Sequence, residues 1–584
     1  MWDFSSTTAP EGVGLGLRTP IGMFTAAESV VPKAEWERVL FAEQPTRTQL
    51  LRLKPVWPLV PLKVRVHRNH AFEHVASVVG PWFAWWQREP SFIYSDYDDS
   101  LAFAFDQTER VDLELLWVDL DRYGDRFASR DIQEWLGSRF TALRARTEAP
   151  IVVALAGTDQ QLHGRVLEAS RSVPGLRVGD MLGLQTKLGD KFYDLRAARF
   201  SGTRLSDGAC ILVAREIACH WAPAVLARRL KAVALDLDHT LYEGVLGEDG
   251  SEVRLTQGHK ELQEYLVKLR KQGLLLSLVS RNEQEDVVSL LERRSDFPLR
   301  REHFSATAVS WDAKANGIRN VAQAMRIGLE AVLFVDDNPG ELAAVASELP
   351  MVALAHASAD PALTRRVLEY YPGLWTWEIS SADELRAADL AADVERHRLG
   401  TAAVDAGDYL RSLQVTVSIE ITPPQQLARM HELSQKTNQF NLNLERFPEV
   451  ELARLLDAND HRVALIGLRD RLSDSGFIGL IVARQEGDVL AIRELAVSCR
   501  ALGRRLEDLM ISQAVRELQL ELACPRIEFL HRTGPRNRPA REWLSRLIGR
   551  PLVPEGRVAA VQHLSRIVAS DYPVSLEIKH HERK

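Results

Sequence analysis

The segment Lys231–Gly250 constrains the fold of this chain more than any other. It begins with a short apolar run, Ala232–Leu235, which predicts a buried strand of a parallel sheet covered on both faces. Asp236 and Asp238 follow the run directly, and Thr240 and a glycine-rich loop come next. Ligand sites in open α/β sheets lie at the carboxyl ends of the strands. Because two acids there repel each other, the pattern favours a bound cation over the alternative, a capped loop with solvated acids.

Length and composition indicate a multidomain globular protein. The chain has 584 residues, for which three to four domains are expected, and its net charge of −7 gives no basic footprint for nucleic acid. No apolar run is long enough to predict a membrane span, and the beginning of the chain lacks a signal-peptide pattern, so we expect a cytoplasmic protein with no membrane partner. The cysteines are too few and too scattered for a disulfide framework or a Cys-rich metal site: Cys210, Cys219, Cys499 and Cys524.

The first part of the chain is divided by its turn residues. Residues 1–59 are predicted to be an N-terminal extension, poorly ordered up to Pro20, with one or two short helices in Ala34–Leu53. From 60 to 228, apolar runs alternate with helical patterns, which is typical of βαβ units around a parallel sheet. The predicted strands are Leu62–Val66, Ser91–Tyr94, Leu113–Val118, Ile151–Ala156 and Leu176–Val178, and the predicted helices are His70–Gln87, Arg130–Thr147 and Gln160–Ser172.

Residues 229–370 repeat this alternation with clearer boundaries. Gly273 ends the first predicted helix, and Asn282 with Glu285 resembles a capping box that opens the second. Besides the opening strand, the predicted elements are the helices Thr256–Lys271, Glu283–Glu292 and Trp311–Ile327 and the strands Leu274–Val279 and Ala331–Val335.

The last part of the chain has a different pattern. Residues 371–405 are charged and Ala-rich and are predicted to form a helical linker, while 406–584 is of α+β composition with antiparallel strands around one long helix. The predicted strands are Val415–Ile421, Arg462–Leu468, Gly479–Gln485, Val489–Leu495 and Arg526–Leu530, and the predicted helices are Pro424–Ser434, Arg505–Leu518 and Pro539–Leu547. The fold class is therefore α/β, with two parallel-sheet domains and one α+β domain.

Polar residues at strand ends and helix starts in 229–370 form an ordered set that a parallel sheet would gather at one edge. A carboxylate nucleophile forms an aspartyl-phosphate, so Asp236 or Asp238 is suited to attack phosphorus while the other transfers a proton to the leaving oxygen. Asp236 and Asp336 would supply the carboxylate oxygens that Mg²⁺ prefers. Ser280 offers a hydroxyl to phosphate oxygens and Lys314 a point charge. The full set is Asp236, Asp238, Thr240, Ser280, Lys314, Asp336 and Asp337.

These motifs resemble those of the haloacid dehalogenase (HAD) superfamily: Asp-x-Asp-x-Thr, a Ser after the second strand, a Lys, and Asp-Asp after a later strand. Receiver domains of response regulators use similar groups in another order. The resemblance implies that Asp236 is the nucleophile and Asp238 the general acid/base, and it gives His239 no role. It also implies Mg²⁺ on Asp236, the main chain of Asp238 and Asp336, with Asp337 close behind. The implied phosphate and substrate ligands are Thr240, Ser280, Arg281, Asn282 and Lys314.

A closer resemblance is to the FkbH-like branch of this superfamily, of HAD-IIIC type. It covers residues 60–570, and its motifs are Val233–Gly250, Val279–Asn282, Trp311–Lys314, Phe334–Pro339, Lys436–Leu442 and Ser498–Gly503. Members usually combine an SGNH-hydrolase-like or flavodoxin-like N-terminal domain, a HAD domain with little or no cap, and a GNAT-like C-terminal domain. The resemblance implies removal of phosphate from 1,3-bisphosphoglycerate and loading of the glyceryl group on the phosphopantetheine thiol of an acyl carrier protein.

The segment Arg500–Arg505 is the candidate for the acyl half of such a reaction. It precedes the predicted long helix, whose N-terminal N–H groups, with Arg500, Gly503 and Arg504, are expected to bind the phosphate of a carrier's pantetheine arm. Arg505 departs from the acetyltransferase pattern, which favours a carrier-bound phosphate over acyl-CoA. Cys499 lies beside Arg500, a setting that favours thiolate, and we hypothesise that it carries the glyceryl thioester; a buried structural cysteine is the alternative.

Residues 60–228 lack the serine and histidine signatures of an active SGNH hydrolase, so this domain is predicted to be structural or to dock the carrier. His67, His70 and His74 are expected at a helix start and on the surface. Two alternatives to glyceryl transfer stay open: a phosphatase of a small metabolite without acyl transfer, and a non-catalytic assembly scaffold, against which the intact acidic set weighs.

Overall fold

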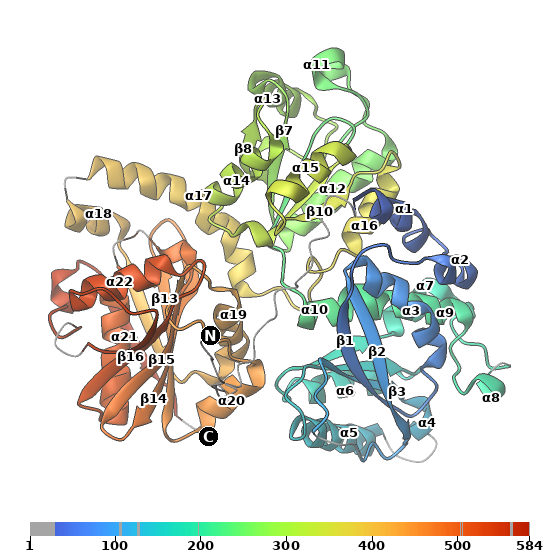
Figure 1. Cartoon of the computed structure of the whole chain (residues 1–584), viewed down its shortest axis with the longest axis horizontal. Helices are drawn as coiled ribbons and strands as arrows, with labels where there is room; N and C mark the ends of the chain where they lie inside the picture. Colours follow the sequence, from blue (N-terminus) through green and yellow to red (C-terminus); the bar gives the residue numbers. More distant parts are fainter. Residues whose placement is uncertain are drawn as a thin grey trace, which may run out of the picture.

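Three β-sheets, each with its own helices, organise the chain, at the lower right, the top and the left of Figure 1. The computed structural model describes residues 30–103, 108–124, 129–196, 198–403, 405–502, 504, 506–560 and 564–582. The predicted disorder of Met1–Pro20 and the predicted role of Gly503 fall outside these residues. The α/β class is confirmed, because two of the sheets are wholly parallel and helices connect their strands.

The first sheet is parallel, in the order β2-β1-β3-β4-β5. All five of its strands were predicted. Strands β3 and β4 are buried along their whole length because helices cover both faces of the sheet. The strands are β1 (Val60–Arg68), β2 (Arg88–Tyr97), β3 (Leu113–Asp119), β4 (Ile151–Ala156) and β5 (Leu176–Asp180). The helices are α3 (Glu73–Trp85), α4 (Asp121–Gly124), α5 (Ser129–Arg144), α6 (Gln160–Ser170), α7 (Leu182–Leu188), α8 (Ala198–Ser201), α9 (Asp207–Glu216) and α10 (Ala222–Leu226).

The predicted N-terminal extension is part of the core from Val30 onward. It forms the helices α1 (Val30–Leu40) and α2 (Arg47–Arg52). Phe41, directly after α1, and Leu50 of α2 are completely buried in the cluster shared by the first two sheets. Arg366, from the second sheet's helices, donates to the carbonyl of Phe41 at 2.7 Å. The extension therefore joins the two parallel sheets.

The helical stretch Asp207–Leu226 is long and apolar enough to cross a membrane by length and composition alone, although Arg215 and Glu216 interrupt its apolar residues. It comprises α9, a π-helical turn and α10, and 78% of its most apolar window is buried inside the protein. Cys210 and Cys219 lie in this stretch within the core cluster of the first two sheets. Its burial is that of a core helix.

The second sheet is also parallel, in the order β10-β9-β6-β7-β8. Its strands are β6 (Ala232–Leu235), β7 (Leu275–Ser280), β8 (Phe304–Val309), β9 (Val332–Asp336) and β10 (Ala353–His356). Its helices are α11 (Leu246–Asp249), α12 (Gln257–Lys271), α13 (Gln284–Arg293), α14 (Lys314–Ala324), α15 (Pro339–Glu348) and α16 (Pro361–Glu369). The three central strands, β6, β7 and β9, are buried at every position.

Local signals set some of these boundaries and missed one. Thr256 caps α12 by accepting a hydrogen bond from the His259 N–H, and Gly273 follows the helix with a φ of +88°, a conformation that favours glycine. The predicted capping box of Asn282 and Glu285 is wrong. Glu283, and not Asn282, is the N-cap residue of α13, and it makes no side-chain cap hydrogen bond. The Asn282 amide instead donates to Asp238.

The predicted linker forms α17 (Ser381–Ala402), a helix with a buried charged face. Arg386 donates to the carbonyl of Gly273 in the second sheet's layer at 2.8 Å. Asp389 pairs with Arg396 at 3.0 Å, and Arg396 pairs with Asp470 beside the third sheet at 2.8 Å. These polar contacts fix the second sheet to the third.

The third sheet follows the order β17-β16-β15-β14-β13-β11-β18, with β12 paired to β15. The predicted antiparallel arrangement holds for most pairs, but β15 with β16 and β11 with β18 are parallel. The first exception arises because a helix, α21, crosses over between β15 and β16. The strands are β11 (Thr416–Ile421), β12 (Phe440–Asn441), β13 (His461–Arg469), β14 (Asp474–Glu486), β15 (Val489–Val497), β16 (Arg526–Arg532), β17 (Glu555–Ala559) and β18 (Ser575–His580). The helices are α18 (Ala406–Leu413), α19 (Leu427–Lys436), α20 (Glu449–Asp457), α21 (Glu507–Leu522) and α22 (Arg538–Ile548). Strands β12, β17 and β18 were not predicted.

Candidate active site

Two carboxylates and a lysine meet at the carboxyl edge of the second sheet. Asp236 follows β6 and Asp336 ends β9, so two hydrogen-bonded parallel strands deliver them to the same place. Lys314 is the first residue of α14, and its Nζ lies 2.9 Å from Asp236 Oδ1 and 2.5 Å from Asp336 Oδ2. Asp236 and Lys314 are each 6% exposed, and Asp336 is fully buried. The predicted nucleophile, point charge and metal ligand thus form one buried cluster.

Burial dominates the electrostatics of this cluster. Burial raises the pKa of Asp236 and of Asp336, and the neighbouring Lys314 opposes this shift in both. Burial alone would lower the pKa of Lys314, but the carboxylates of Asp236 and Asp336 hold it above its ordinary value. Asp337, half-buried beside the pair, also has a raised pKa, because of burial and then of the Asp236 charge. One ammonium therefore faces more negative charge than it can neutralise.

The donor set fits a divalent cation. One oxygen each from Asp236, Asp336 and Asp337 lies within 4.8 Å of the others, which places the three predicted side-chain ligands together. Carboxylate oxygens at such spacing, completed by water, are what Mg²⁺ takes in proteins. The Asp238 side chain is not among these oxygens.

The Asp238 carboxylate is oriented by donors from three directions. Its Oδ1 accepts from the Tyr242 hydroxyl at 2.6 Å and from the Leu246 N–H at 2.9 Å, and its Oδ2 accepts from the Asn282 amide at 3.0 Å. The loop after β6 turns back over the site through α11, which supplies the Leu246 N–H, and Figure 1 shows this helix at the top of the molecule. A held carboxylate beside Asp236 is suited to pass a proton. Tyr242 was missed in the sequence, although it lies four positions after Asp238, within reach of a turn.

The other predicted phosphate ligands divide into two groups. Ser280, at the end of β7, and Asn282 are buried and joined by a hydrogen bond of 3.1 Å, and the hydroxyl of buried Thr240 has no partner among the described residues. These polar groups are available to phosphate oxygens. Arg281 is turned to Glu341 of α15, with which it pairs at 2.7 Å, so the structure does not place its guanidinium with the cluster. His239 is exposed.

The predicted acyl site lies elsewhere. Cys499 is half-buried in a single 3₁₀ turn, and its Sγ donates to the Arg326 carbonyl at 2.8 Å. Lys231, directly before β6, lines the same cavity as Cys499, whereas Asp236 lies directly after β6. Five steps of extended chain separate these ends by about 16 Å. In this structure the carboxylate cluster and Cys499 lie toward opposite edges of the second sheet.

Arg504, a predicted ligand of the carrier's phosphate, is paired inside the protein. Its side chain is buried, and Nη2 donates to Asp389 of α17 at 3.1 Å and to the Ser475 hydroxyl at 3.0 Å. The first turn of α21 carries Glu507 and Asp508, which disfavour an anion at that N-terminus. No pattern in the sequence predicts that Asp389 of α17 is the ion-pair partner of Arg504. Arg500, by contrast, lines the cavity beside Cys499.

In the third sheet, β15 and β16 separate at a point where an extended ligand could have entered, and the chain's own strand β12 fills this place. Beyond Ile492, β15 is no longer paired with β16, and β12 pairs there instead, with Phe440 opposite Val497. The N–H of Leu442 donates to the Leu495 carbonyl at 3.0 Å, and the N–H of Arg532 donates to the Leu442 carbonyl at 3.0 Å. The chain's own segment thus bridges both strands.

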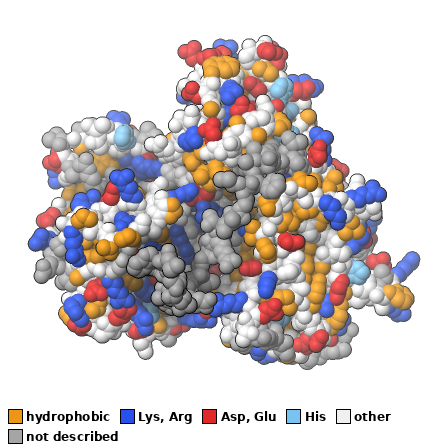
Figure 2. Space-filling view, in the orientation of Figure 1, with side chains coloured by type: hydrophobic (Ala, Val, Ile, Leu, Met, Phe, Trp, Pro, Cys, Tyr) orange, Lys and Arg blue, Asp and Glu red, His pale blue; other side chains and the backbone are white. Residues whose placement is uncertain are grey.

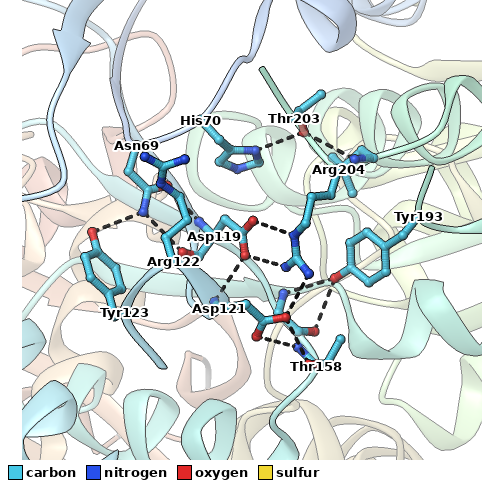
Figure 3. A network of polar contacts seen from close by, with 12 residues as sticks. Asn69, His70, Asp119, Asp121, Arg122, Tyr123, Thr158, Tyr193, Thr203 and Arg204 are labelled. Atoms are coloured by element: carbon cyan, nitrogen blue, oxygen red, sulfur yellow. Dashed lines mark hydrogen bonds and ion pairs between the residues drawn. The ribbon is translucent and has the colours of Figure 1, made fainter. Parts of the chain in front are cut away.

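A second polar network lies at the carboxyl edge of the first sheet (Figure 3). Arg204 pairs with Asp119 at 2.6 Å and with Asp121 at 2.9 Å, and Thr158 donates to Asp121 at 2.9 Å. His70 is buried and bonded to Thr203, and His67, also buried, to Glu114, so the prediction of surface histidines is wrong for both. These charged groups satisfy one another, as in a structural network, and the labelled residues include no serine nucleophile.

Comparisons with known proteins add partial likenesses. No protein-family model matches the chain, and the search of curated proteins found no match. Among solved structures, the N-terminal part of the protein BF1531 from Bacteroides fragilis, containing a phosphatase domain complexed with Mg, is 19% identical with a TM-score of 0.41, over 58% of this chain and 96% of that chain. A mutant of spermidine N-acetyltransferase SpeG from Vibrio cholerae is 13% identical with a TM-score of 0.20, over 26% of this chain and 97% of that one. A putative HAD family hydrolase from Streptomyces avermitilis is 21% identical with a TM-score of 0.19, over 25% of this chain and 91% of that one. These likenesses are too partial to carry an argument, so the chemistry rests on the geometry above.

Proposed function

We propose that the chain is a cytoplasmic Mg²⁺-dependent phosphatase or phosphotransferase that serves acyl transfer. The observation that carries the phosphate chemistry is the buried cluster of Asp236, Lys314 and Asp336, with Asp238 held beside it. The finer proposal follows from the FkbH-like resemblance. In it, the substrate is 1,3-bisphosphoglycerate, and the glyceryl unit is loaded as a thioester on an acyl carrier protein for polyketide or hybrid peptide biosynthesis.

The phosphate step uses the two carboxylates in turn. An oxygen of Asp236 attacks the phosphorus of the phosphate ester, not of the acyl phosphate, and forms the aspartyl-phosphate, while the bond between phosphorus and the ester oxygen breaks and Asp238 gives that oxygen a proton. Asp238 then takes a proton from water, whose oxygen attacks the aspartyl-phosphate and releases inorganic phosphate. Lys314 and the Ser280 hydroxyl stabilise the oxygens of the transferring group. A bound Mg²⁺ would neutralise charge on the phosphoryl group when held by Asp236, Asp336 and Asp337.

The acyl step needs a thiol. The sulfur attacks the acyl-phosphate carbonyl of the donor, so a carbon–sulfur bond forms, the carbon–oxygen bond to phosphate breaks, phosphate leaves and the thiol proton passes to solvent. The first thiol in this proposal is that of Cys499, from which the glyceryl group moves to the phosphopantetheine thiol. Mass spectrometry after incubation with the donor would show the adduct on Cys499; the same adduct on Cys499→Ser protein would refute this role.

Phosphate release in the presence of Mg²⁺, 1,3-bisphosphoglycerate and a holo carrier protein tests the proposal as a whole. We expect phosphate release and carrier acylation in the wild type, and neither phosphate-ester hydrolysis nor turnover in Asp236→Asn protein. Asp312→Asn is a matched control, because Asp312 is an exposed carboxylate near Lys314 that lies outside the cluster. Undiminished phosphate-ester hydrolysis by Asp236→Asn protein would refute the proposal.

A phosphatase of a small phosphorylated metabolite, acting without acyl transfer, is the second candidate. It is favoured by one observation: Lys231, which lines the cavity of Cys499, and Asp236 lie at opposite ends of β6, about 16 Å apart along the strand. Phosphate release without acylation of the carrier would decide for this candidate.

A further inference from the structure

A cavity of about 130 Å³ lies at the junction of the second sheet, α17 and the third sheet. Its walls come from the segments before β6 and β9, from α17 and α19, and from the turn that follows β15. Both C-terminal motifs of the resemblance reach it, through Lys436–Gln439 and Ser498–Arg500. Neither motif has a part in the phosphate chemistry at Asp236.

The cavity is strongly basic. Nine Lys or Arg residues and four Asp or Glu residues line it, in a chain whose net charge is −7. On the face shown in Figure 2, basic and acidic side chains are otherwise interspersed. Most of the lining cations are paired: Lys436 with Glu432 at 2.7 Å and Arg326 with Asp393 at 2.6 Å are examples. For Lys231 and Arg500, the described residues provide no carboxylate within 4.0 Å.

The two unpaired cations, Lys231 and Arg500, are half-buried. Burial lowers the pKa of Lys231 to about 8 and the pKa of Arg500 to about 10, which means that the charged forms lack full compensation. A buried charge without a partner costs free energy that a bound anion would recover. Arg500 makes only a long hydrogen bond, of 3.4 Å, to the Ala382 carbonyl among the described residues, so its guanidinium is available for a forked contact with an anion.

We propose that this cavity binds a phosphate-bearing ligand, with Lys231 and Arg500 on the phosphate and Cys499 beside the rest of the ligand. The site is separate from the carboxylate cluster, because Lys231 and Asp236 lie at opposite ends of β6. It deepens the proposed function by giving the thiol of Cys499 an anion-binding surface. Its phosphate is therefore one that orients the ligand and is not the one that Asp236 attacks. A free phosphorylated metabolite and the phosphopantetheine arm of a carrier share this chemistry.

Titration calorimetry with inorganic pyrophosphate in EDTA tests the site on the full chain. We use Asp236→Asn protein as the background, so that the carboxylate cluster neither turns over the probe nor is required for the result. We expect one site in this background, and an affinity at least about tenfold lower after Lys231→Met or Arg500→Met, since each removes one charged contact to the phosphate. Arg319→Met, which removes an exposed arginine paired with Glu348, is the matched control and should bind as its parent does.

Alkylation of Cys499 provides a second readout, because Cys210, Cys219 and Cys524 are buried. Pyrophosphate should slow the reaction of Cys499 with iodoacetamide about tenfold at saturation in the parent and much less in Lys231→Met protein. Stronger protection by 4′-phosphopantothenate, the thiol-free part of the arm that iodoacetamide does not alkylate, than by 3-phosphoglycerate would identify the arm as the source, and the reverse order a metabolite. Absence of pyrophosphate binding, or binding that survives both cavity substitutions, would overturn the proposal. Loss of phosphatase activity in Asp236→Asn protein with binding intact would support the site whatever the fate of the proposed function.

Discussion

Replacing Lys314 by Met removes the ammonium that lies between Asp236 and Asp336 and leaves an apolar side chain of similar length. The two carboxylates are 6% and 0% exposed, so water cannot take over the role of the cation. Breaking a buried ion pair by removing one partner costs about 3–5 kcal/mol, because a buried charge is left without compensation. Without metal, we therefore expect the unfolding free energy to fall by about 3 kcal/mol at pH 8.

The size of this loss depends on pH in a defined direction. Burial already raises the pKa of Asp236 and of Asp336 above their unfolded values, and loss of Lys314 raises both further. An acid whose folded pKa is raised destabilises the fold only when it ionises. The cost is therefore absent below the unfolded pKa and grows as the pH rises through the folded one. The loss should be smaller at pH 5 than at pH 8.

Urea unfolding in EDTA measures the loss. With a slope of about 2 kcal/mol/M, 3 kcal/mol lowers the midpoint by about 1.5 M. Added Mg²⁺ should restore part of this shift, because a divalent cation replaces the missing charge at the same carboxylates. Phosphatase activity should fall by about 10²–10³-fold even with Mg²⁺, since Lys314 also faces the transferring group.

Lys271→Met is the control for this experiment, because Lys271 is an exposed lysine at the end of α12. Its midpoint should be unchanged. The reasoning is refuted if Lys314→Met protein in EDTA unfolds within about 0.3 M urea of the wild type at pH 8, or if its loss is larger at pH 5.

Three further predictions concern other buried polar groups. Burial raises the pKa of Glu37 to about 8, although the Trp85 hydrogen bond opposes this shift. Wild-type stability should therefore fall as the pH rises from about 4.5 to about 8. In Glu37→Gln protein, the urea midpoint should change less with pH over this range. Asp389→Asn should lower the unfolding free energy by about 3 kcal/mol, because Arg396 and Arg504 lose a buried partner; a thermal midpoint equal to the wild type's would contradict this. Asn282→Ala should lower kcat about tenfold with little change in the thermal midpoint, because it removes the donor to Asp238 Oδ2 and leaves only the two donors to Oδ1; an unchanged kcat would show that this contact is not needed.

The carboxylate cluster could be predicted because its members carry local signals. Asp236 and Asp336 each end a short apolar run, and a parallel sheet brings the ends of such runs to one edge whatever the details of packing. Lys314 could be placed for the same reason, as the first residue of a helix that returns to that edge. Mistaken predictions came from residues whose side chains have distant partners. Asn282 was expected to cap a helix but bonds to Asp238, and His70 was expected on the surface but stacks on Trp117.

By itself, the sequence determined the five strands of the first parallel sheet, the three central strands of the second and the order of the acidic residues on them, because apolar runs and turn residues act over a few positions. It did not predict β8 and β10, the two edge strands of the second sheet, whose residues are mostly half-buried. The tertiary structure alone decided which basic side chains have an ion-pair partner and which remain available to a ligand. It buried Arg504 against Asp389 of a helix more than a hundred positions away, and it left Lys231 and Arg500 together in a basic cavity. The segment Lys231–Gly250 shows most clearly what the sequence determined and what the tertiary structure decided. Its first residue, Lys231, and its first acid, Asp236, are five positions apart in sequence, and the strand between them places them at opposite edges of one sheet. Pairing between distant residues depends on how whole layers dock, and no local pattern carries that information.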